Sequence, residues 1–156
     1  MAGQGSQYPG MAKDLYESVE AVRTLFDRAE TIRPGTLSLM FDGNVADLKR
    51  TDCTQPCLFL ADLASAIALE AEGIVPAATA GFSLGEIAAL AVSGMLDAED
   101  AFRLVCRRGE LMQKAAERNT VLLPFGVPLL IPCHFQSCTR MLSATESRIK
   151  TVPNAL

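Results

Sequence analysis

A glycine-flanked serine turn, Gly81-Phe82-Ser83-Leu84-Gly85, is the most informative part of this sequence. The pattern G-x-S-x-G is typical of a nucleophile elbow, in which a serine on a tight strand-to-helix turn projects its hydroxyl above a sheet edge. The N-terminal N–H groups of the following helix favour negative charge. Ser83 is therefore a candidate nucleophile, and the N–H of Leu84 is placed to stabilise a tetrahedral oxyanion. The alternative is a helix N-cap serine without a chemical role.

The residues around this turn predict an α/β fold. Residues 77–80 are a short strand candidate built from small side chains, and residues 84–93 predict a helix closed by Gly94. The order helix, strand, glycine-flanked turn and helix is an α/β arrangement. This context favours a nucleophile at Ser83 over a simple cap.

Upstream of the turn, hydrophobic periodicity predicts two helices. Apolar residues recur at helical spacing over residues 11–29, with charged residues between them. A second helix begins after Thr54, carries Pro56 in its first turn and ends at Gly73. Because it is apolar almost all round, we expect it to be well buried.

A further helix is predicted from Asp97, whose side chain can cap the first turn, to about Glu117. Arg108 falls on the apolar face of this helix, whereas Arg107 falls on the solvated side. A guanidinium on an apolar face needs a partner. It either forms a structural ion pair with a nearby carboxylate or binds the carboxylate of a ligand bidentately. The predicted apolar face comprises Ala101, Leu104, Val105, Leu111, Met112 and Ala115.

The chain opens on a glycine-rich segment, Gly3-Gln4-Gly5-Ser6-Gln7, directly before the first helix. Glycines allow a backbone loop to approach a ligand closely and to aim its N–H groups at an anion. The alternative is a frayed terminus. A phosphate loop is excluded, because no Gly-Lys-Ser/Thr follows.

Composition bounds the function classes. The 49% hydrophobic and 21% charged content are typical of a globular protein, and a net charge of −4 gives no footprint for nucleic acid. No segment has the unbroken apolar length of a membrane span and no signal peptide is recognisable, so we expect a cytoplasmic protein. Five cysteines in such a chain indicate reduced thiols.

The composition changes near Asn119, which predicts two parts, residues 1–118 and 119–156. Residues 1–118 hold 17 acidic and 11 basic residues, whereas residues 119–156 hold one acidic and three basic residues and four of the eight prolines. The second part contains the only histidine, His134, between Cys133 and Cys138. These three lack a second ligand pair at metal spacing, so no metal site is expected.

Taken in order, these segments resemble the malonyl-CoA:acyl carrier protein transacylases and the related acyltransferase domains of fatty acid and polyketide synthases. The resemblance covers residues 3 to about 118 and implies a partial α/β-hydrolase-like acyltransferase core, lacking the family's first strand and its small ferredoxin-like subdomain. Phe82 stands where most members have histidine. The matching strings are Gly3-Gln4-Gly5-Ser6-Gln7 with Pro9-Gly10-Met11, Thr54-Gln55-Pro56, Gly81 to Glu86 with Ala88-Ala89-Leu90, Arg103-Leu104-Val105, and Arg108-Gly109 with Met112-Gln113.

The resemblance implies a role for each matched site residue. Ser83 would carry the acyl group as an ester, and the backbone N–H groups of Gln4 and Leu84 would form the oxyanion hole. Arg108 would hold the free carboxylate of malonyl, with Gln55 in a supporting role. The implied reaction passes malonyl from malonyl-CoA through Ser83 to the phosphopantetheine thiol of acyl carrier protein, with no cofactor or metal.

Three functions remain open from the sequence. The family's catalytic histidine belongs to the half that follows residue 118, and neither His134 nor the rest of residues 119–156 resembles that half. The change at Asn119 therefore suggests a truncated or frame-shifted gene product. The chain is a malonyltransferase, an α/β-hydrolase-type esterase using the same elbow, or a non-enzymatic remnant that at most binds acyl carrier protein.

Overall fold

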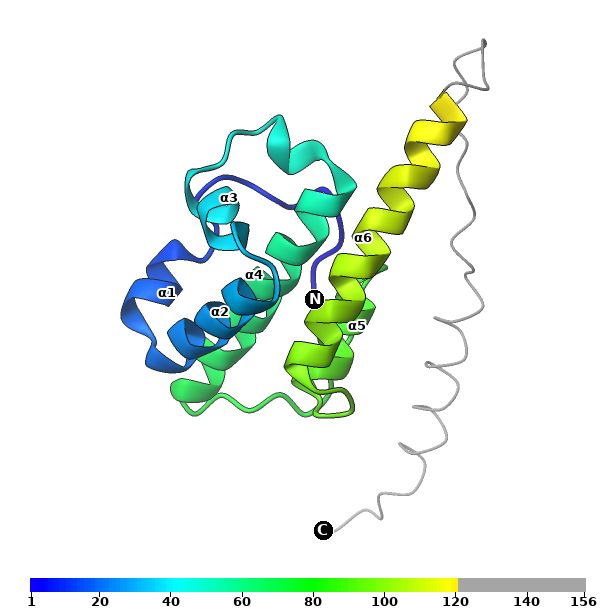
Figure 1. Ribbon diagram of the computed structural model, residues 1–156. Helices are drawn as coiled ribbons and strands as arrows, with labels where there is room; N and C mark the ends of the chain where they lie inside the picture. Colours follow the sequence, from blue (N-terminus) through cyan, green and yellow to red (C-terminus); the bar gives the residue numbers. More distant parts are fainter. Residues whose placement is uncertain (121–156) are drawn as a thin grey trace, which may run out of the picture. The chain divides into compact units, whose positions relative to one another are not determined.

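The computed structural model describes residues 1–120, which belong to one compact unit of the chain (Figure 1). Within these residues there are helices but no β-strand. The helices are α1 (Lys13–Ser18), α2 (Glu20–Ile32), α3 (Thr36–Asp42), the 3₁₀ helix η1 (Asp47–Lys49), α4 (Thr51–Ala71), α5 (Leu84–Val92) and α6 (Ala98–Thr120).

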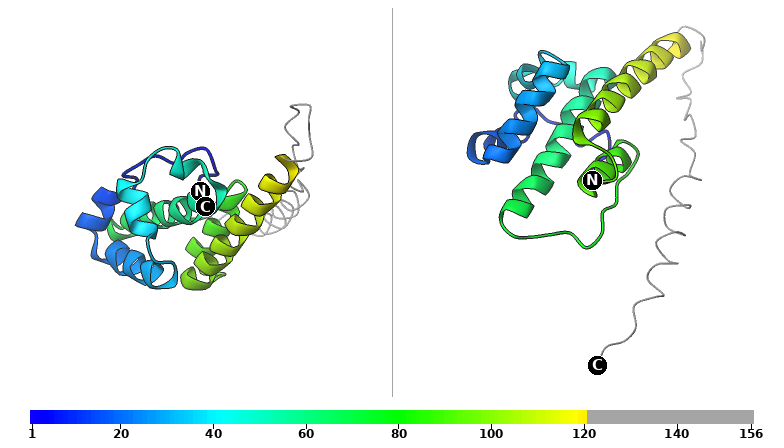
Figure 2. Two further views of the ribbon diagram at one scale, coloured as in Figure 1. Left: turned by 45° about the horizontal axis from the view of Figure 1, so that its top comes forward. Right: turned by 60° about the horizontal axis from the view of Figure 1, so that its bottom comes forward.

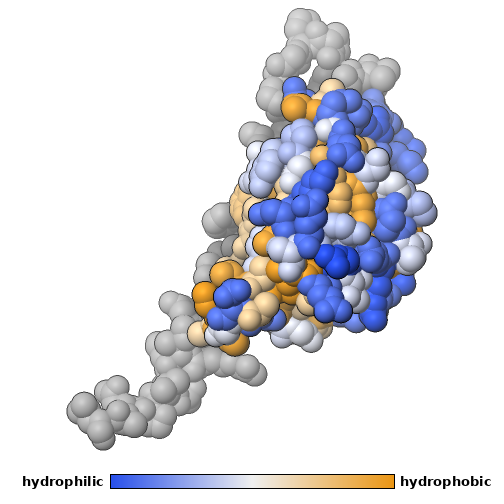
Figure 3. All heavy atoms as spheres, turned by 90° about the vertical axis from the view of Figure 1, so that its left-hand side faces the viewer, coloured by the Kyte–Doolittle hydropathy of each residue, from blue (hydrophilic) through white to orange (hydrophobic). Residues whose placement is uncertain are grey.

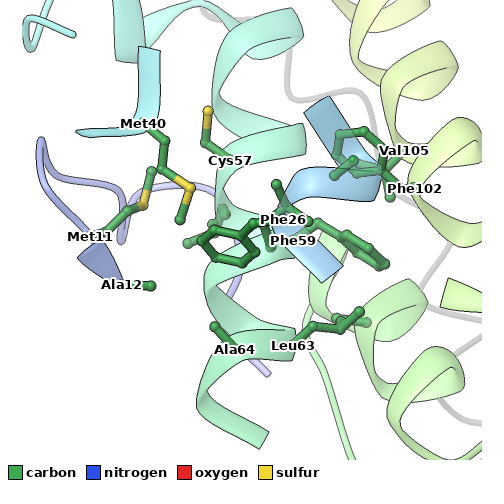
Figure 4. Close-up of a cluster of buried hydrophobic side chains, with 14 of the residues drawn as sticks. Met11, Ala12, Phe26, Met40, Cys57, Phe59, Leu63, Ala64, Phe102 and Val105 are labelled. Carbon is green, nitrogen blue, oxygen red and sulfur yellow. The ribbon is translucent and has the colours of Figure 1, made fainter. Parts of the chain in front are cut away.

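Helix α4 lies at the centre of the described unit. It contacts α1, α2 and α3 on one side and α5 and α6 on the other (Figures 1 and 2). Residues 54–60 of this helix are all buried, as its apolar composition predicts. Phe59 of α4 packs against Phe102 of α6 with ring centroids 6.1 Å apart, and Val22 and Phe26 of α2 enter the same core (Figure 4). On the side of α1, mainly hydrophilic side chains surround smaller apolar patches (Figure 3).

The first predicted helix is interrupted. Val19 is extended between α1 and α2, with φ −113° and ψ 112°, so residues 11–29 form two helices instead of one. The hydroxyl of Ser18 donates to the carbonyl of Asp14 at the end of α1. The break lets Tyr16 fold back onto Phe26, with the rings stacked 5.8 Å apart. Tertiary aromatic packing thus overrides a helical repeat that would continue through Val19.

The central helix begins earlier than predicted. It starts at Thr51, so Pro56 lies in its second turn rather than its first. The end agrees with the prediction, because Gly73 has φ +80° and the N–H of Ile74 donates to the carbonyl of Leu69 at 2.9 Å. That bond, with a glycine in the left-handed conformation, is the Schellman ending of a helix.

The strand predicted at residues 77–80 is wrong. This segment is irregular and mostly exposed. Its main chain meets the amino group of Met1, which donates to the carbonyl of Ala80 at 2.6 Å, but no second extended segment runs beside it within residues 1–120. A strand satisfies its backbone groups only through a neighbouring strand. The described part is therefore all-helical, and it lacks the sheet of the predicted α/β fold.

The two helices after the turn are confirmed. Helix α5 ends before Gly94, which has φ +72°, and Asp97 caps α6 by accepting the N–H groups of Glu99 and Asp100 at 2.9 and 3.2 Å. The apolar face predicted for α6 is only partly correct. Ala101 and Val105 are buried together with Phe102 and Gly109, whereas Leu104 is 50% and Leu111 51% exposed.

Some predictions fall outside the described residues. Apart from the end of α6, this holds for the part predicted at residues 119–156, including His134, Cys133 and Cys138. Residues 1–120 contain no helix that is long and apolar enough to cross a membrane, and no group of three metal-binding side chains. The described cysteines Cys53, Cys57 and Cys106 are free thiols.

Candidate active site

Ser83 lies on a strained turn at the start of α5. Its backbone has φ +55° and ψ −102°, and among the described non-glycine residues only Ala12 also has a positive φ. A serine pays a conformational cost for this backbone, which is typical of a functional turn. The N–H of Ser83 donates to Glu86 Oε1 at 3.1 Å, which helps to hold the turn. The local geometry of an elbow is thus present, although no strand precedes it.

The two glycines of the turn are required because a side chain at either position would clash with neighbouring backbone atoms. A Cβ at Gly81 would collide with the carbonyl oxygen of Gly85. A Cβ at Gly85 would lie 2.5 Å from the carbonyl oxygen of Met1, because the start of the chain runs directly against the turn. Real side chains do not approach backbone atoms so closely, so the motif's glycines allow the turn and the N-terminal segment to pack together.

Arg108 joins three separate helices at this turn. Its Nη2 donates to Ser83 Oγ at 3.0 Å, and its Nη1 donates to Gln55 Oε1 at 2.8 Å. Gln55 is fully buried in α4, and its Nε2 contacts Met112 Sδ at 3.2 Å. Gly109 permits this close approach of α6, since its Cα faces the backbone of Thr51 and Asp52. Three residues predicted from distant parts of the sequence therefore meet at one point.

The sequence left two partners open for Arg108, a nearby carboxylate of the protein or the carboxylate of a ligand. No carboxylate within residues 1–120 forms an ion pair with Arg108, so a structural ion pair there is wrong for the described part of the chain. Arg107 instead pairs with Glu110 at 3.0 Å on the exposed side of α6, as predicted. The fork of Arg108 is held by two neutral oxygens, Gln55 Oε1 and Ser83 Oγ, and an anionic ligand can replace the serine hydroxyl.

The N-terminal glycine segment is folded against the turn, so the frayed terminus is wrong. The N–H of Ala2 donates to Asp62 Oδ1 at 3.0 Å, and Gln7 Nε2 donates to the carbonyl of Leu48 at 3.2 Å. Gly3 lies so close to Phe82 that a Cβ there would be 2.9 Å from the Phe82 carbonyl oxygen.

The two backbone donors suggested for an oxyanion hole come from opposite sides of the serine turn, Leu84 from the turn itself and Gln4 from the N-terminal segment packed against it. Leu84 follows Ser83 and is buried, and Gln4 follows Gly3, which contacts the turn. Within residues 1–120 neither of their N–H groups donates a hydrogen bond. The side chain of Gln4 is engaged elsewhere, with Nε2 3.4 Å from Thr51 Oγ1.

Comparison with known proteins identifies the family. Residues 1–123 match the acyl transferase domain family. The malonyl CoA-acyl carrier protein transacylase of Bacillus subtilis (strain 168) is 45% identical over 114 residues, covering 72% of this chain and 36% of that protein. The chain belongs to the acyl transferase domain family.

Solved structures agree with this assignment. The malonyl CoA-acyl carrier protein transacylase of Clostridium perfringens matches with a TM-score of 0.69 at 36% identity, over 73% of this chain and 36% of that one. An acyl carrier protein S-malonyltransferase from Vibrio cholerae matches with a TM-score of 0.68 at 41% identity, over 73% and 38%. The chain thus spans just over a third of the length of these relatives.

One charged residue of this acyl transferase domain was missed in the sequence. Asp62 lies in α4, is only 8% exposed, and its Oδ2 is buried without a partner among the described residues. Burial raises the pKa of this carboxyl above its ordinary value, while the Ala2 N–H and the amino group of Met1 act in the opposite direction. The available signal was the single charge within the apolar run of residues 58–69.

Within the described part of this acyl transferase domain, no side chain that can accept a proton hydrogen-bonds to Ser83 Oγ. Within residues 1–120, Arg108 is the side chain that contacts Ser83 Oγ, and a guanidinium cannot accept a proton. The sole histidine, His134, lies outside these residues. The hydroxyl of Ser83 is thus hydrogen-bonded to a cationic side chain within residues 1–120.

Proposed function

We propose that the protein transfers a malonyl group from coenzyme A to the phosphopantetheine thiol of an acyl carrier protein, with Ser83 as the acyl-accepting nucleophile. The observation that carries this proposal is the 3.0 Å contact between Arg108 Nη2 and the hydroxyl of Ser83 on its strained turn. A cationic fork beside a serine is useful when the acyl group bears its own carboxylate. Such a fork binds a carboxylate bidentately.

The malonyl ester would rearrange this contact. Malonyl places its free carboxylate one methylene beyond the ester carbonyl, so acylation of Ser83 brings that carboxylate to the guanidinium. Arg108 then exchanges the serine hydroxyl for the carboxylate. Gln55 supports the fork throughout, because its buried Oε1 accepts Nη1 at 2.8 Å and fixes the plane of the guanidinium.

The oxyanion of each tetrahedral intermediate would be bound by backbone donors. The N–H groups of Gln4 and Leu84 are assigned this role because they flank Ser83 and donate no hydrogen bond within residues 1–120. Leu84 is also the first residue of α5, where the helix dipole favours negative charge. Preorganised donors of this kind are worth about 10²–10³ in rate each.

The reaction proceeds in two half-reactions. Ser83 Oγ attacks the thioester carbonyl, forming the ester C–O bond and breaking the C–S bond, and the coenzyme A sulfur leaves as a thiol. The phosphopantetheine thiol then attacks the ester carbonyl, forming a new C–S bond and breaking the ester C–O bond, and Ser83 Oγ leaves with the proton given up by the thiol. A base from outside residues 1–120 accepts the serine proton in the first step.

The substrates are assigned from relatives. The Bacillus subtilis relative is named as a malonyl CoA-acyl carrier protein transacylase. A solved complex of a type II PKS acyl-carrier protein with its malonyl-transacylase matches this chain with a TM-score of 0.67 at 38% identity, over 38% of that chain. These names support malonyl-CoA and acyl carrier protein as the two partners.

The two other functions make different demands on the site. An esterase acting on neutral esters has no use for a guanidinium at its nucleophile, so the Arg108 contact disfavours it. A non-enzymatic remnant that at most binds acyl carrier protein is favoured by one observation: within residues 1–120 no proton-accepting side chain hydrogen-bonds to Ser83 Oγ.

The test is intact-mass analysis after incubation with malonyl-CoA, with Ser83→Ala as the control. We expect a malonyl adduct on the unsubstituted chain that the alanine variant lacks, and its discharge on adding acyl carrier protein that bears a phosphopantetheine thiol. Binding of malonate with no adduct would instead identify a domain without the first half-reaction. Faster hydrolysis of a neutral ester than consumption of malonyl-CoA would identify the esterase.

A further inference from the structure

The buried acidic side chain of α4 calls for a physical explanation. Asp62 is 8% exposed, its Oδ2 has no hydrogen-bond partner within residues 1–120, and it stands in an otherwise uncharged, largely apolar run of α4 at residues 58–69. A buried carboxyl with an unsatisfied oxygen destabilises a fold, and an apolar side chain of similar volume is often the more stable choice. Stability alone therefore does not account for this residue.

The one hydrogen bond of Asp62 reaches the start of the chain. Oδ1 accepts the N–H of Ala2 at 3.0 Å across 60 residues of sequence. Ala2 itself lies against the serine turn, because its carbonyl oxygen would be 2.8 Å from a Cβ at Gly85. The next residue, Gly3, touches Phe82, the residue before the nucleophile. Asp62 thus holds the segment that leads into Gln4 against the turn that carries Ser83.

The downstream side of the same segment is held independently. Gly5 N–H donates to Gln7 Oε1 at 2.8 Å, and Gln7 Nε2 donates to the carbonyl of Leu48 at 3.2 Å. Upstream, the side-chain anchor is Asp62, assisted by the contact of the Met1 amino group with Ala80. Loss of the Asp62 bond would therefore leave the contact of Met1 with Ala80 as the upstream hydrogen bond of residues 1–3, while the loop beyond Gln4 stays attached.

A small-ligand site at Asp62 is the weaker alternative. A half-open cavity of about 290 Å³ lies beside it, lined among others by Ser6, Tyr8, Asp14 and Ser65. The unpartnered Oδ2, however, is closed off from solvent. An oxygen that water does not reach is not placed to bind a ligand from this cavity. The geometry instead favours a role in which Asp62 holds the N-terminal segment through the N–H of Ala2.

We infer that Asp62 is a positioning residue that sets the backbone N–H of Gln4 relative to Ser83 through its hydrogen bond to Ala2. This inference rests on the proposed function, in which the Gln4 N–H binds the oxyanion. Donors of an oxyanion hole must be held within about 0.5 Å of the productive geometry. A bond from a buried carboxyl to a backbone N–H is a strong way to fix such a segment.

The test compares three variants. Asp62→Leu removes the acceptor, Asp62→Asn keeps an acceptor oxygen, and Ala2→Pro removes the N–H donor while Asp62 stays in place. We expect Asp62→Leu and Ala2→Pro each to lower the rate of Ser83 acylation by malonyl-CoA by roughly 10- to 100-fold, part of the loss for a whole oxyanion donor. The KM for malonyl-CoA should change little, and Asp62→Asn should stay within about threefold of the unsubstituted protein.

A second measurement separates this inference from the proposed function. Amide hydrogen exchange over residues 3–7 should become faster in Asp62→Leu and Ala2→Pro, but not in Asp62→Asn. If the unsubstituted protein forms no adduct while exchange responds in this way, the proposed function fails and the positioning role stands. If Ala2→Pro leaves both exchange and acylation unchanged, the positioning role is overturned. Equal damage from Asp62→Asn and Asp62→Leu would overturn it as well.

Discussion

The guanidinium of Arg108 donates a hydrogen bond to the hydroxyl of Ser83 at 3.0 Å, from the middle of α6 to the turn before α5. These residues are 25 positions apart, and the contact is supported from a third helix by Gln55. The resting site is thus ordered around a positive charge rather than around a base. A cation at this place favours both a developing oxyanion and the carboxylate of an acidic acyl group.

The first prediction concerns the choice of acyl group. Arg108→Ala should lower kcat/KM for malonyl-CoA by roughly 10- to 100-fold, as expected for loss of a charged hydrogen bond of about 1.5–3 kcal/mol. Acetyl-CoA carries no free carboxylate and should lose much less. The matched control is Arg107→Ala, because Arg107 pairs with Glu110 on the surface of the same helix. The measurement is the malonyl-to-acetyl ratio of adduct formation, and an unchanged ratio would refute the carboxylate clamp.

The second prediction concerns the support of that arginine. Gln55→Leu removes the acceptor of Arg108 Nη1 in a fully buried position. The unsatisfied N–H should lower the free energy of unfolding by about 1–3 kcal/mol. It should also raise the KM for malonyl-CoA, because the fork is no longer held in one plane. Urea denaturation and steady-state kinetics measure the two effects, and a variant with unchanged KM would show that Gln55 serves only the core.

The third prediction concerns the space at the serine turn. Gly85→Ala places a methyl group 2.5 Å from the Met1 carbonyl oxygen, so the N-terminal segment must move. Overpacking of this kind costs about 1–3 kcal/mol of stability. Gly94→Asn is the matched control, since Gly94 has a positive φ that asparagine tolerates and open space around it. Thermal unfolding of both variants should separate them, and equal melting temperatures would contradict the steric account.

The fourth prediction concerns cysteine reactivity. Burial raises the pKa of Cys57 to about 12 and that of Cys106 to about 11, so both are protonated near neutral pH. The thiolate is the reactive form. We therefore expect an alkylating reagent to modify partly exposed Cys53 well before fully buried Cys57 in the folded protein, and all of them alike after denaturation. Peptide mapping by mass spectrometry follows the order, and early modification of folded Cys57 would contradict its burial.

The fifth prediction concerns pH. Burial raises the pKa of Asp62 above 3.8, so the native state binds this proton more tightly than the unfolded chain. The stability that the protonated Asp62 carboxyl contributes is present at low pH, and it is lost as pH rises through the pKa of Asp62 in the folded protein. Asp62→Asn does not titrate, so its free energy of unfolding relative to the unsubstituted protein should increase from about pH 4 to about pH 7.

The control for this pH effect is a second carboxylate beside the same cavity, Asp14. The other titratable groups there are Tyr8, the exposed Asp14 and the nearby amino group of Met1. The comparison variant is Asp14→Asn, with urea unfolding measured in the same way. A constant difference between Asp62→Asn and the unsubstituted protein across this range would mean that Asp62 titrates normally.

Local patterns in the sequence determined much of this protein. The end of α5, the start of α6 with its cap at Asp97, the strained elbow at Ser83 and the opposite sides of Arg107 and Arg108 follow from residue type and spacing, because helix caps and periodicity act over one or two turns.

Contacts between distant segments were decided only by the tertiary structure. The break at Val19 reflects the packing of Tyr16 on Phe26, and residues 77–80 form no strand because no described segment pairs with them. The bond of Asp62 to Ala2 and the meeting of Arg108, Gln55 and Ser83 depend on how α4, α6 and the N-terminal segment pack. The spacing of residues along the chain does not give the distance between segments that are far apart in sequence. These contacts therefore form only when the helices pack around a common core.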